Sequence, residues 1–382
     1  MRKLIIILIS AFAIITVGLI VLLVVVIGYG GFPANNSSSG FSDLKLVNTQ
    51  NTSLEDVEAI DIDYHSEDVE FFTSDTEELV LKEYMNYSPE EDEFTKITKS
   101  GRTLNLKGRA DRFNNGNFGI NRYRRMEIYL PAGYNGALSI STSSGVIETD
   151  LVLILKEFEA SCSSGDIKMN EVTAETIDAS SSSGCITFHK AEGDRDFSSS
   201  SGDIEIHAGV GDTQVSSTSG SITVENSVGL LEAEASSGDI VIEKSSGKKN
   251  IKTTSGEIEI TDSDGFTKAE ASSGDIQITE LAGAGDFNST SGEVTVIFAK
   301  DASLINENIK IKSSSGDVAL TIPEELQFSF QANTSSGEIR TYFNNRLDFD
   351  RDEREASGSI GNSPVINLGI STTSGSIEVN SR

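Results

Sequence analysis

The 382-residue chain contains no tryptophan, five prolines, two cysteines and three histidines. The absence of tryptophan and the few outward aromatic residues argue against the aromatic cleft of a glycan-cleaving enzyme. The histidines, His65, His189 and His207, are scattered, and no nucleophile elbow, phosphate loop or paired metal ligands accompany them. Serine is abundant, but a serine nucleophile needs a base and an oriented partner. We therefore expect no enzymatic activity and keep a glycan-active β-helix enzyme as the alternative.

The two cysteines, Cys162 and Cys185, occupy neighbouring copies of a repeat but are offset by four positions within it. In register, this offset spans roughly 13 Å at about 3.3 Å per residue. A disulfide needs Cα atoms within about 7 Å. The sequence therefore predicts two free thiols.

Basic residues are also scarce. The chain has 30 lysines and arginines and 59 acidic residues, which gives a net charge of −29. Such a surface repels phosphate backbones and anionic headgroups, which argues against nucleic-acid binding. Cations and cationic peptides remain as electrostatic partners. Solubility alone is the simpler explanation of the charge.

A long apolar run lies near the N-terminus: residues 4–28 carry no charge and are dominated by Ile, Leu and Val. About 20 such residues cross a bilayer, and Arg2 and Lys3 should stay in the cytoplasm. A cleaved signal peptide is the alternative, but its apolar core is shorter, and Gly28 to Phe32 is a poor cleavage site. We expect a short tail and signal anchor over 1–31, a flexible spacer over 32–43, and an extracytoplasmic chain beyond them. The predicted location is the cell membrane, with a single pass.

The rest of the chain is dominated by a repeat in which Ser-Gly, preceded by Ser or Thr, is followed two positions later by Ile or Val. Its spacing is 18 residues from Gly184 to Gly292. A fixed period of this size is typical of a solenoid, one coil per repeat. The twelve repeat glycines, which we expect at coil corners, are Gly145, Gly165, Gly184, Gly202, Gly220, Gly238, Gly256, Gly274, Gly292, Gly316, Gly337 and Gly375.

The positions around each glycine predict how a coil is built. Apolar residues lie five positions before the glycine and two and usually four positions after it. The inward side chains therefore fall on odd positions before the corner and on even positions after it, so the alternation must shift by one residue at the corner. A glycine with φ > 0 would allow that switch. A second glycine follows nine residues later in five coils (Gly211, Gly229, Gly247, Gly265 and Gly283). We therefore predict an all-β, flattened parallel β-solenoid with two half-turns per coil over 139–382.

Two segments depart from the repeat. Residues 44–138 alternate without a strict period, and residues 66–71 resemble an eroded copy; we interpret this region as a β-rich cap continuous with the solenoid. Residues 342–364 include a dense charged run and are expected to form a charged loop leaving the stack.

An acidic residue follows the corner glycine in most coils, as at Asp166, Asp203 and Glu257. In register these carboxylates form a column, which invites comparison with calcium-binding β-rolls. Those rolls use several oxygen ligands from a Gly-Gly-x-Gly-x-Asp repeat, whereas one acid per 18 residues occurs here, and Val146 and Cys185 interrupt the column. We expect turn chemistry and no bound cofactor or metal, with a calcium-stabilised roll as the alternative.

The Ser-Ser-Gly-Asp-Ile repeats, together with residues 126–131 and 138–145, resemble the bacterial putative-adhesin family of β-strand-repeat proteins, a domain-of-unknown-function family. The resemblance covers roughly residues 55–382. It implies a surface or envelope protein, often linked to envelope stress, and no assigned catalytic residues. We expect a membrane-anchored binding, adhesion or scaffolding module whose partner is an envelope protein, a wall polymer or a cationic peptide.

Overall fold

The computed structural model describes residues 44–108 and 122–382, and Lys45–Arg382 form one compact unit. The predicted anchor and spacer, residues 1–43, lie outside the described residues. Over the described ranges, no helix combines the length and apolar character needed to cross a membrane. The helical elements found there are three single turns: η1 (Glu91–Glu93), η2 (Ala302–Leu304) and η3 (Asn344–Arg346).

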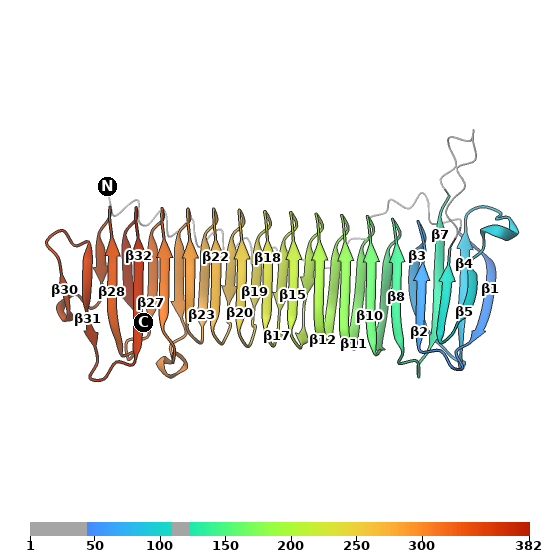
Figure 1. Cartoon of the computed structure of the whole chain (residues 1–382), viewed down its shortest axis with the longest axis horizontal. Coiled ribbons are helices and arrows are strands. Elements are labelled where there is room, and N and C mark those ends of the chain that lie inside the picture. The colour runs from blue at the N-terminus through green and yellow to red at the C-terminus, as the bar shows by residue number, and fades with distance from the viewer. Residues whose placement is uncertain (1–43, 109–121) are drawn as a thin grey trace, which may run out of the picture. The chain divides into compact units, whose positions relative to one another are not determined.

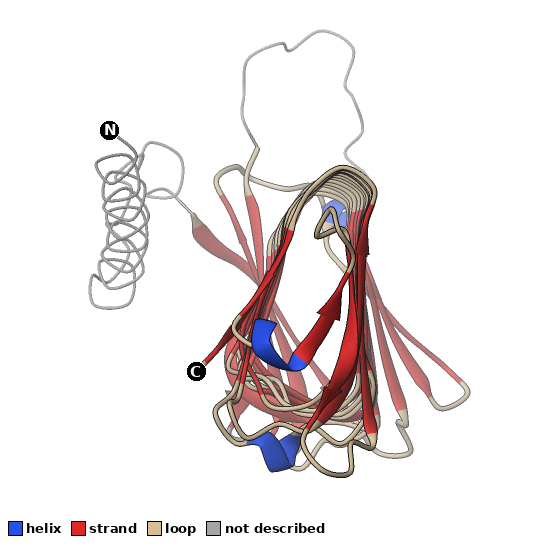
Figure 2. Ribbon diagram, turned by 90° about the vertical axis from the view of Figure 1, so that its left-hand side faces the viewer, coloured by secondary structure: helices blue, strands red, loops and turns tan. Residues whose placement is uncertain are grey.

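The unit is a parallel β-solenoid whose coils each contribute one strand before the Ser-Gly corner and one after it (Figures 1 and 2). The strands before the corner form what we call the leading sheet. In stacking order these are β6 (Thr103–Lys107), β2 (Ala59–Asp63), β8 (Ala137–Thr142), β10 (Glu157–Cys162), the last parts of β11 (Ile167–Ser181) and β12 (Ile186–Ser199), β15 (Thr213–Ser217), β18 (Leu231–Ala235), β20 (Lys249–Thr253), β22 (Thr267–Ala271), β24 (Gly285–Ser289), β26 (Ile309–Ser313), β32 (Ile366–Thr372) and β28 (Phe328–Thr334).

The strands after the corner form the trailing sheet, which is parallel throughout the coils. In stacking order these are β7 (Arg124–Pro131), β3 (Asp68–Ser74), β9 (Ile147–Ile154), the first parts of β11 and β12, β13 (Ile204–Ile206), β16 (Ile222–Glu225), β19 (Ile240–Glu243), β21 (Ile258–Thr261), β23 (Ile276–Leu281), β25 (Val294–Phe298), β27 (Val318–Ile322), β33 (Ile377–Ser381) and β29 (Ile339–Thr341).

The 18-residue period sets the register, and the core follows from it. Ile222 pairs with Ile240, and Ile240 pairs with Ile258, each one period apart. These isoleucines are fully buried, as are Ile251 and Phe287 from the leading sheet. The in-register stacking of inward aliphatic side chains that the sequence predicts is therefore confirmed.

The cross-section differs from the flattened, two-faced coil that we expected. The two sheets approach each other at the Ser-Gly corner and diverge toward the opposite side, which we call the base (Figure 2). There, short strands form a third ladder: the middle parts of β9, β11 and β12, followed by β14 (Gly209–Val210) and β17 (Ser227–Val228). This ladder closes the core on the side where the two sheets are farthest apart (Figure 2).

The corner glycines are required for a reason other than the expected positive φ. A Cβ on Gly256 would overlap the carbonyl oxygen of Gly238 in the neighbouring coil, and the same overlap with a backbone carbonyl recurs at each repeat glycine. Their φ values are not in the left-handed region, whereas those of base glycines such as Gly211 (φ 121°) and Gly247 (φ 113°) are. The corner thus needs glycine for close approach, and the base needs it for backbone conformation.

In nine of the twelve copies, the corner is also held from inside by a Ser or Thr hydroxyl three residues before the glycine. The amide of Gly256 donates to Thr253 Oγ1 at 3.0 Å, and that hydroxyl donates to the Gly238 carbonyl at 3.3 Å. Cys162 takes this place in its coil, where its Sγ accepts from the Gly165 amide. Small polar residues therefore satisfy buried backbone groups at the narrow edge of the core.

Antiparallel strands close both ends of the stack. At the N-terminal end, β4 (Glu78–Met85) pairs with β7, β1 (Lys45–Ser53) pairs with β4, and β5 (Lys96–Ser100) pairs with β6. At the other end, the segment 342–364 is not the charged loop that we expected. It forms β30 (Leu347–Phe349) and β31 (Glu355–Ile360), and β31 pairs antiparallel with β28. Covering the last strand in this way removes an open edge.

The coils at both ends are stacked out of sequence order. The final coil, β32 and β33, lies between β26 and β28 in the leading sheet and between β27 and β29 in the trailing sheet (Figure 1). At the other end, β2 lies between β6 and β8. Register Val69↔Ile147 aligns residues 66–71 with the main repeat, and Glu67 stands where a corner glycine would.

Candidate functional site

The acidic column after the corner glycine is a backbone-binding device. In stacking order this position holds Asp68, Val146, Asp166, Cys185, Asp203, Ser221, Asp239, Glu257, Asp275, Glu293, Asp317, Ser376 and Glu338. Aspartate thus occupies every second coil up to Asp317. Each of these six aspartates accepts, through Oδ1, the amide of the same position in the next coil, at 2.7–3.0 Å. Because the final coil follows Asp317 in space, the amide that Asp317 binds is that of Ser376 and not that of Glu338.

The column therefore has a period of two coils, or 36 residues where the repeat is regular. Alternation keeps aspartates apart and leaves each one a backbone donor, which offsets the cost of placing like charges in one line. At Asp166, partial burial acts to raise the pKa, but hydrogen bonds from Lys168 and the Cys185 amide outweigh it and lower the pKa. Across the described residues, no three His, Cys, Asp or Glu side chains are grouped to hold a metal ion.

Removing one of these aspartates should cost stability, whereas removing the acid in the next coil should not. Asp239→Ala deletes the acceptor of the Glu257 amide at 2.8 Å, so we expect a loss of about 1 kcal/mol in the free energy of unfolding. Glu257→Ala is the matched control, because its exposed carboxylate makes no such bond; its change should stay within about 0.5 kcal/mol. Urea unfolding of both variants measures the difference. Equal losses would contradict the role assigned to the aspartates.

The charged residues on the outward side of the trailing sheet are almost all acidic between β9 and β33. Between β9 and β33 it carries Glu148, Asp150, Asp166, Asp203, Glu205, Glu225, Asp239, Glu243, Glu257, Glu259, Asp275, Glu293, Asp317 and Glu378. Lys168 is the only lysine at these described positions, and arginine does not occur among them. The pKa of Glu257 is raised by burial and by Asp275, Glu259 and Asp239 around it. The face therefore concentrates negative potential.

The leading sheet differs because its carboxylates alternate with lysines over the second half of the stack. Lys268 pairs with Glu270 at 2.8 Å, Lys310 pairs with Asp286 at 3.3 Å, and Lys252 approaches Glu234 at 3.9 Å. Four lysines point outward there: Lys252, Lys268, Lys310 and Lys312. Between β8 and β32 on the leading sheet and between β9 and β33 on the trailing sheet, four of the five outward lysines therefore lie on the leading sheet, which composition alone cannot reveal.

The histidines and cysteines do not assemble a reactive centre. His207 lies at an outward position, as predicted, and its ring stacks on that of His189 with centroids 5.4 Å apart. Its Nδ1 lies 3.5 Å from a carboxylate oxygen of Glu225. Both cysteines are free, as predicted, and burial raises the pKa of the Cys162 thiol.

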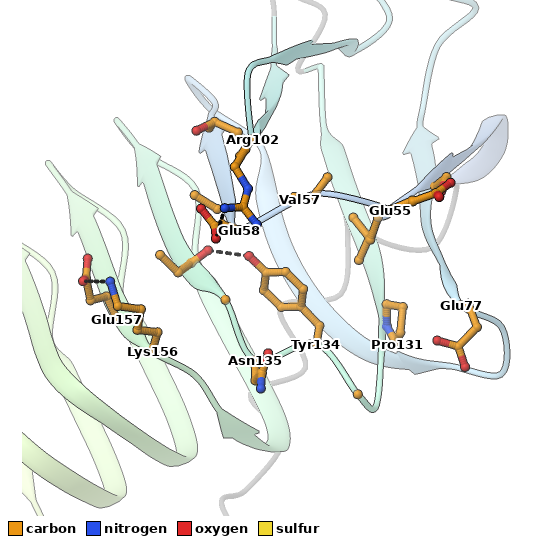
Figure 3. A pocket seen from close by; sticks show the side chains of 17 residues that line it. Glu55, Val57, Glu58, Glu77, Arg102, Pro131, Tyr134, Asn135, Lys156 and Glu157 are labelled. Atoms are coloured by element: carbon orange, nitrogen blue, oxygen red, sulfur yellow. Dashed lines mark hydrogen bonds and ion pairs between the residues drawn. The ribbon is translucent and has the colours of Figure 1, made fainter.

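A groove of about 830 Å³ opens at the base of the N-terminal end (Figure 3). Five connections converge on it: the turns between β1 and β2, β3 and β4, β5 and β6, β7 and β8, and β9 and β10. Tyr134 lies at its centre, with Pro131 and Val57 on one side and Lys156 and Glu157 on the other (Figure 3). Its volume lies in the range of about 300–1,000 Å³ typical of ligand pockets.

Ion pairs and hydrogen bonds fix the groove's polar groups. Arg102 pairs with Glu58, and Lys156 pairs with Glu157 at 2.9 Å. The Tyr134 hydroxyl donates to the Ala137 carbonyl at 2.6 Å, and partial burial raises the pKa of this tyrosine. No sequence motif indicates this groove, because its lining comes from turns that lie as much as about 100 residues apart along the chain.

Comparison with known families decides the chain's relationship. The Toastrack DUF4097 family matches residues 57–249, 193–306 and 232–380, which together cover most of the chain. The chain belongs to this family. The overlap of the three matches reflects a Toastrack repeat that can be aligned one or more coils apart.

Among solved structures, a "putative cell adhesion protein" from Clostridium sporogenes aligns with 89% of this Toastrack chain and 100% of its own, at 11% identity and a TM-score of 0.24. At this TM-score nothing is transferred from that protein. No curated protein matches the chain.

Proposed function

We propose that the protein is a membrane-anchored, extracytoplasmic binding module of a bacterial envelope, and that its trailing sheet binds a cationic partner such as a basic peptide segment. The observation that carries this proposal is the difference in charge between the two sheets over the second half of the stack, where lysines accompany the carboxylates on the leading sheet and none do so on the trailing sheet up to β33. Solubility alone does not require a face of one charge sign, because a surface of mixed charges, like the second half of the leading sheet, is also soluble. A face with a carboxylate in nearly every coil and one lysine is instead complementary to a cation-rich chain.

The geometry suits an extended partner better than a compact one. Coils repeat every ~4.8 Å, which lies between the ~3.3 Å rise per residue and the ~6.6 Å same-face repeat of an extended peptide, so the long side chains of successive basic residues can each reach a carboxylate. Glu243, Glu257 and Glu259 lie on two neighbouring coils and form no ion pair in the described structure. Their charges are free to meet a partner's lysines and arginines, and association should be steered by the field and weakened by salt.

Anchoring and location rest on the sequence. The uncharged run over residues 4–28 and the preceding Arg2 and Lys3 support a single pass with the N-terminus in the cytoplasm. We infer an adhesion or scaffolding role there, connected with envelope stress, and no enzymatic activity. Recovery of the full chain in the soluble fraction after alkaline washing of membranes would contradict the anchor.

Neutralising the trailing sheet should weaken binding of a polycation. The variant Glu243→Gln, Glu257→Gln, Glu259→Gln removes three unpaired carboxylates. Its matched control, Glu234→Gln, Glu270→Gln, Asp286→Asn, removes three carboxylates that lie beside lysines on the leading sheet. With fluorescent poly-L-lysine and the full chain in detergent, we expect at least tenfold weaker binding for the first variant and less than threefold for the control.

Salt provides the second readout of this experiment. Binding should fall as ionic strength rises, and its salt dependence should be shallower for the trailing-sheet variant than for the control. Equal affinities for the two variants would show that only net charge matters, and the proposal would then be wrong.

A further inference from the structure

The groove at the base of the N-terminal end is a surface distinct from the acidic trailing sheet. Its carboxylates, Glu55, Glu58, Glu77 and Glu157, belong to turns and to β10 and not to the outward positions of that sheet. Along the base between β12 and β24, short turns follow one another from coil to coil (Figure 2). Here the cap strands send their connections to the same place, so a hollow forms where loops meet on a rigid scaffold.

The centre of the groove is a single aromatic ring held in position. The Tyr134 hydroxyl is used in its bond to Ala137, so the ring cannot swing away without losing that bond. Pro131 and Val57 extend the apolar surface beside it (Figure 3). The exposed apolar floor is small, because Tyr134 and Val57 are half-buried and Pro131 is buried.

The rim is polar, and its cations are already neutralised. Arg102 and Lys156 each pair with a carboxylate, so an anionic ligand would have to compete with Glu58 or Glu157. The same pairs still offer N–H donors and oxygen acceptors side by side, because each guanidinium or carboxylate has more than one bonding site. Asn135 adds an amide at the edge of the groove (Figure 3).

We propose that this groove binds a saccharide segment, with the apolar face of one sugar ring packed on Tyr134 and its hydroxyl groups bonded to the Arg102–Glu58 and Lys156–Glu157 pairs. A sugar ring presents both surfaces that the groove needs: C–H groups on one face and hydroxyl groups around its edge. The volume of about 830 Å³ and the open shape accommodate part of a longer chain, as a wall polymer would require. This site is independent of the cationic partner proposed above.

The test uses one variant that fills the groove and one that removes the tyrosine ring. Gly133 lines the groove, and an added Cβ there meets no atom within 4 Å, so the backbone tolerates Gly133→Phe and the variant places an aromatic ring at the groove. Gly369→Phe is the matched control, because Gly369 also has open space around it but lies on β32 near the other end of the sequence. Tyr134→Ala removes the ring, and Tyr134→Phe keeps it.

The probes are an oligosaccharide array that includes muropeptides and β-1,4-linked N-acetylglucosamine oligomers, followed by calorimetry with any bound member, using the full chain in detergent. We expect binding to fall at least tenfold in Gly133→Phe and Tyr134→Ala, and to stay within threefold in Tyr134→Phe and Gly369→Phe. Thermal melts show whether each variant is folded.

Two outcomes would overturn the proposal. One is that no saccharide binds the wild-type chain more tightly than it binds Tyr134→Ala. The other is that Gly133→Phe weakens poly-L-lysine and leaves saccharide binding unchanged, in which case the groove is a peptide site. Because the polycation experiment uses other residues, either proposal can fail while the other stands.

Discussion

Replacing Gly256 by alanine should lower the stability of the solenoid by about 3 kcal/mol, at the upper end of what overpacking usually costs. The new Cβ would overlap the carbonyl oxygen of Gly238, which belongs to the backbone of the neighbouring coil and cannot rotate away. Relief requires the two coils to separate at the corner. This would weaken the bonds of Thr253 Oγ1 to the Gly238 carbonyl and of the Glu257 amide to Asp239.

The matched control is Gly369→Ala, because a Cβ at Gly369 meets no atom within 4 Å. We expect its free energy of unfolding to stay within about 1 kcal/mol of the wild-type value or to rise, since alanine restricts the unfolded chain more than glycine does. Urea unfolding compares the two variants, and hydrogen exchange should show faster exchange at the Gly256 corner alone. If both alanines changed stability equally, the close approach would not be the reason for glycine at the corners.

The coil itself could be predicted because its physical requirements repeat. Each copy places an aliphatic residue two positions after the glycine and an apolar residue five before it, so periodicity indicated the inward face and the register. Ile240 and Ile258 lie where this pattern puts them. The reason for the glycine was misjudged because a missing side chain satisfies both a positive φ and a close contact. The sequence shows only that the side chain is missing.

The stacking order of the coils could not be predicted from the sequence, because the repeat that reveals each coil also makes the coils alike. Every copy offers equivalent edges, so nothing local tells β32 to pair with β26 and β28 instead of following β29. Capping decides the order. Because β31 pairs antiparallel with β28, that edge of the leading sheet is closed. The chain that follows, β32 and β33, therefore pairs on the other side of β28 and β29, next to β26 and β27. The prediction of a charged loop at residues 342–364 was wrong because the charged residues there lie on a short exposed hairpin.

The candidate surfaces were only partly visible in the sequence. The position after the glycine was enough to predict the acidic column, and turn chemistry was the role expected for it. The two-coil alternation of Asp239 with Glu257 became meaningful only when stacking gave each aspartate a partner amide. The groove around Tyr134 was not predictable, because a tyrosine in a turn has no recognisable signature until five connections surround it.

The second large effect concerns the buried ion pair at the N-terminal end, where Glu67 takes the place of a corner glycine. Glu67 is fully buried: one carboxylate oxygen accepts from Arg124 Nη1 at 2.6 Å, and the other accepts from the amides of His65 and Ser66 at 2.8 and 2.7 Å. Glu67→Gln keeps the size of the side chain. It puts an NH₂ group either against the guanidinium or against two N–H donors, so one contact becomes repulsive.

We expect this change to cost about 3–5 kcal/mol, as for other buried pairs that lose one charge. Glu58→Gln is the matched control, because it neutralises the exposed Arg102–Glu58 pair, and an exposed pair contributes at most about 1 kcal/mol. Thermal unfolding, with hydrogen exchange in β3 and β7, distinguishes the two. The carbonyl of Glu67 is also the surface on which Gly145 packs, so loosening Glu67 should open the stack from this end. Equal losses in the two variants would mean that the buried charge does not hold the cap and that strand pairing alone closes it.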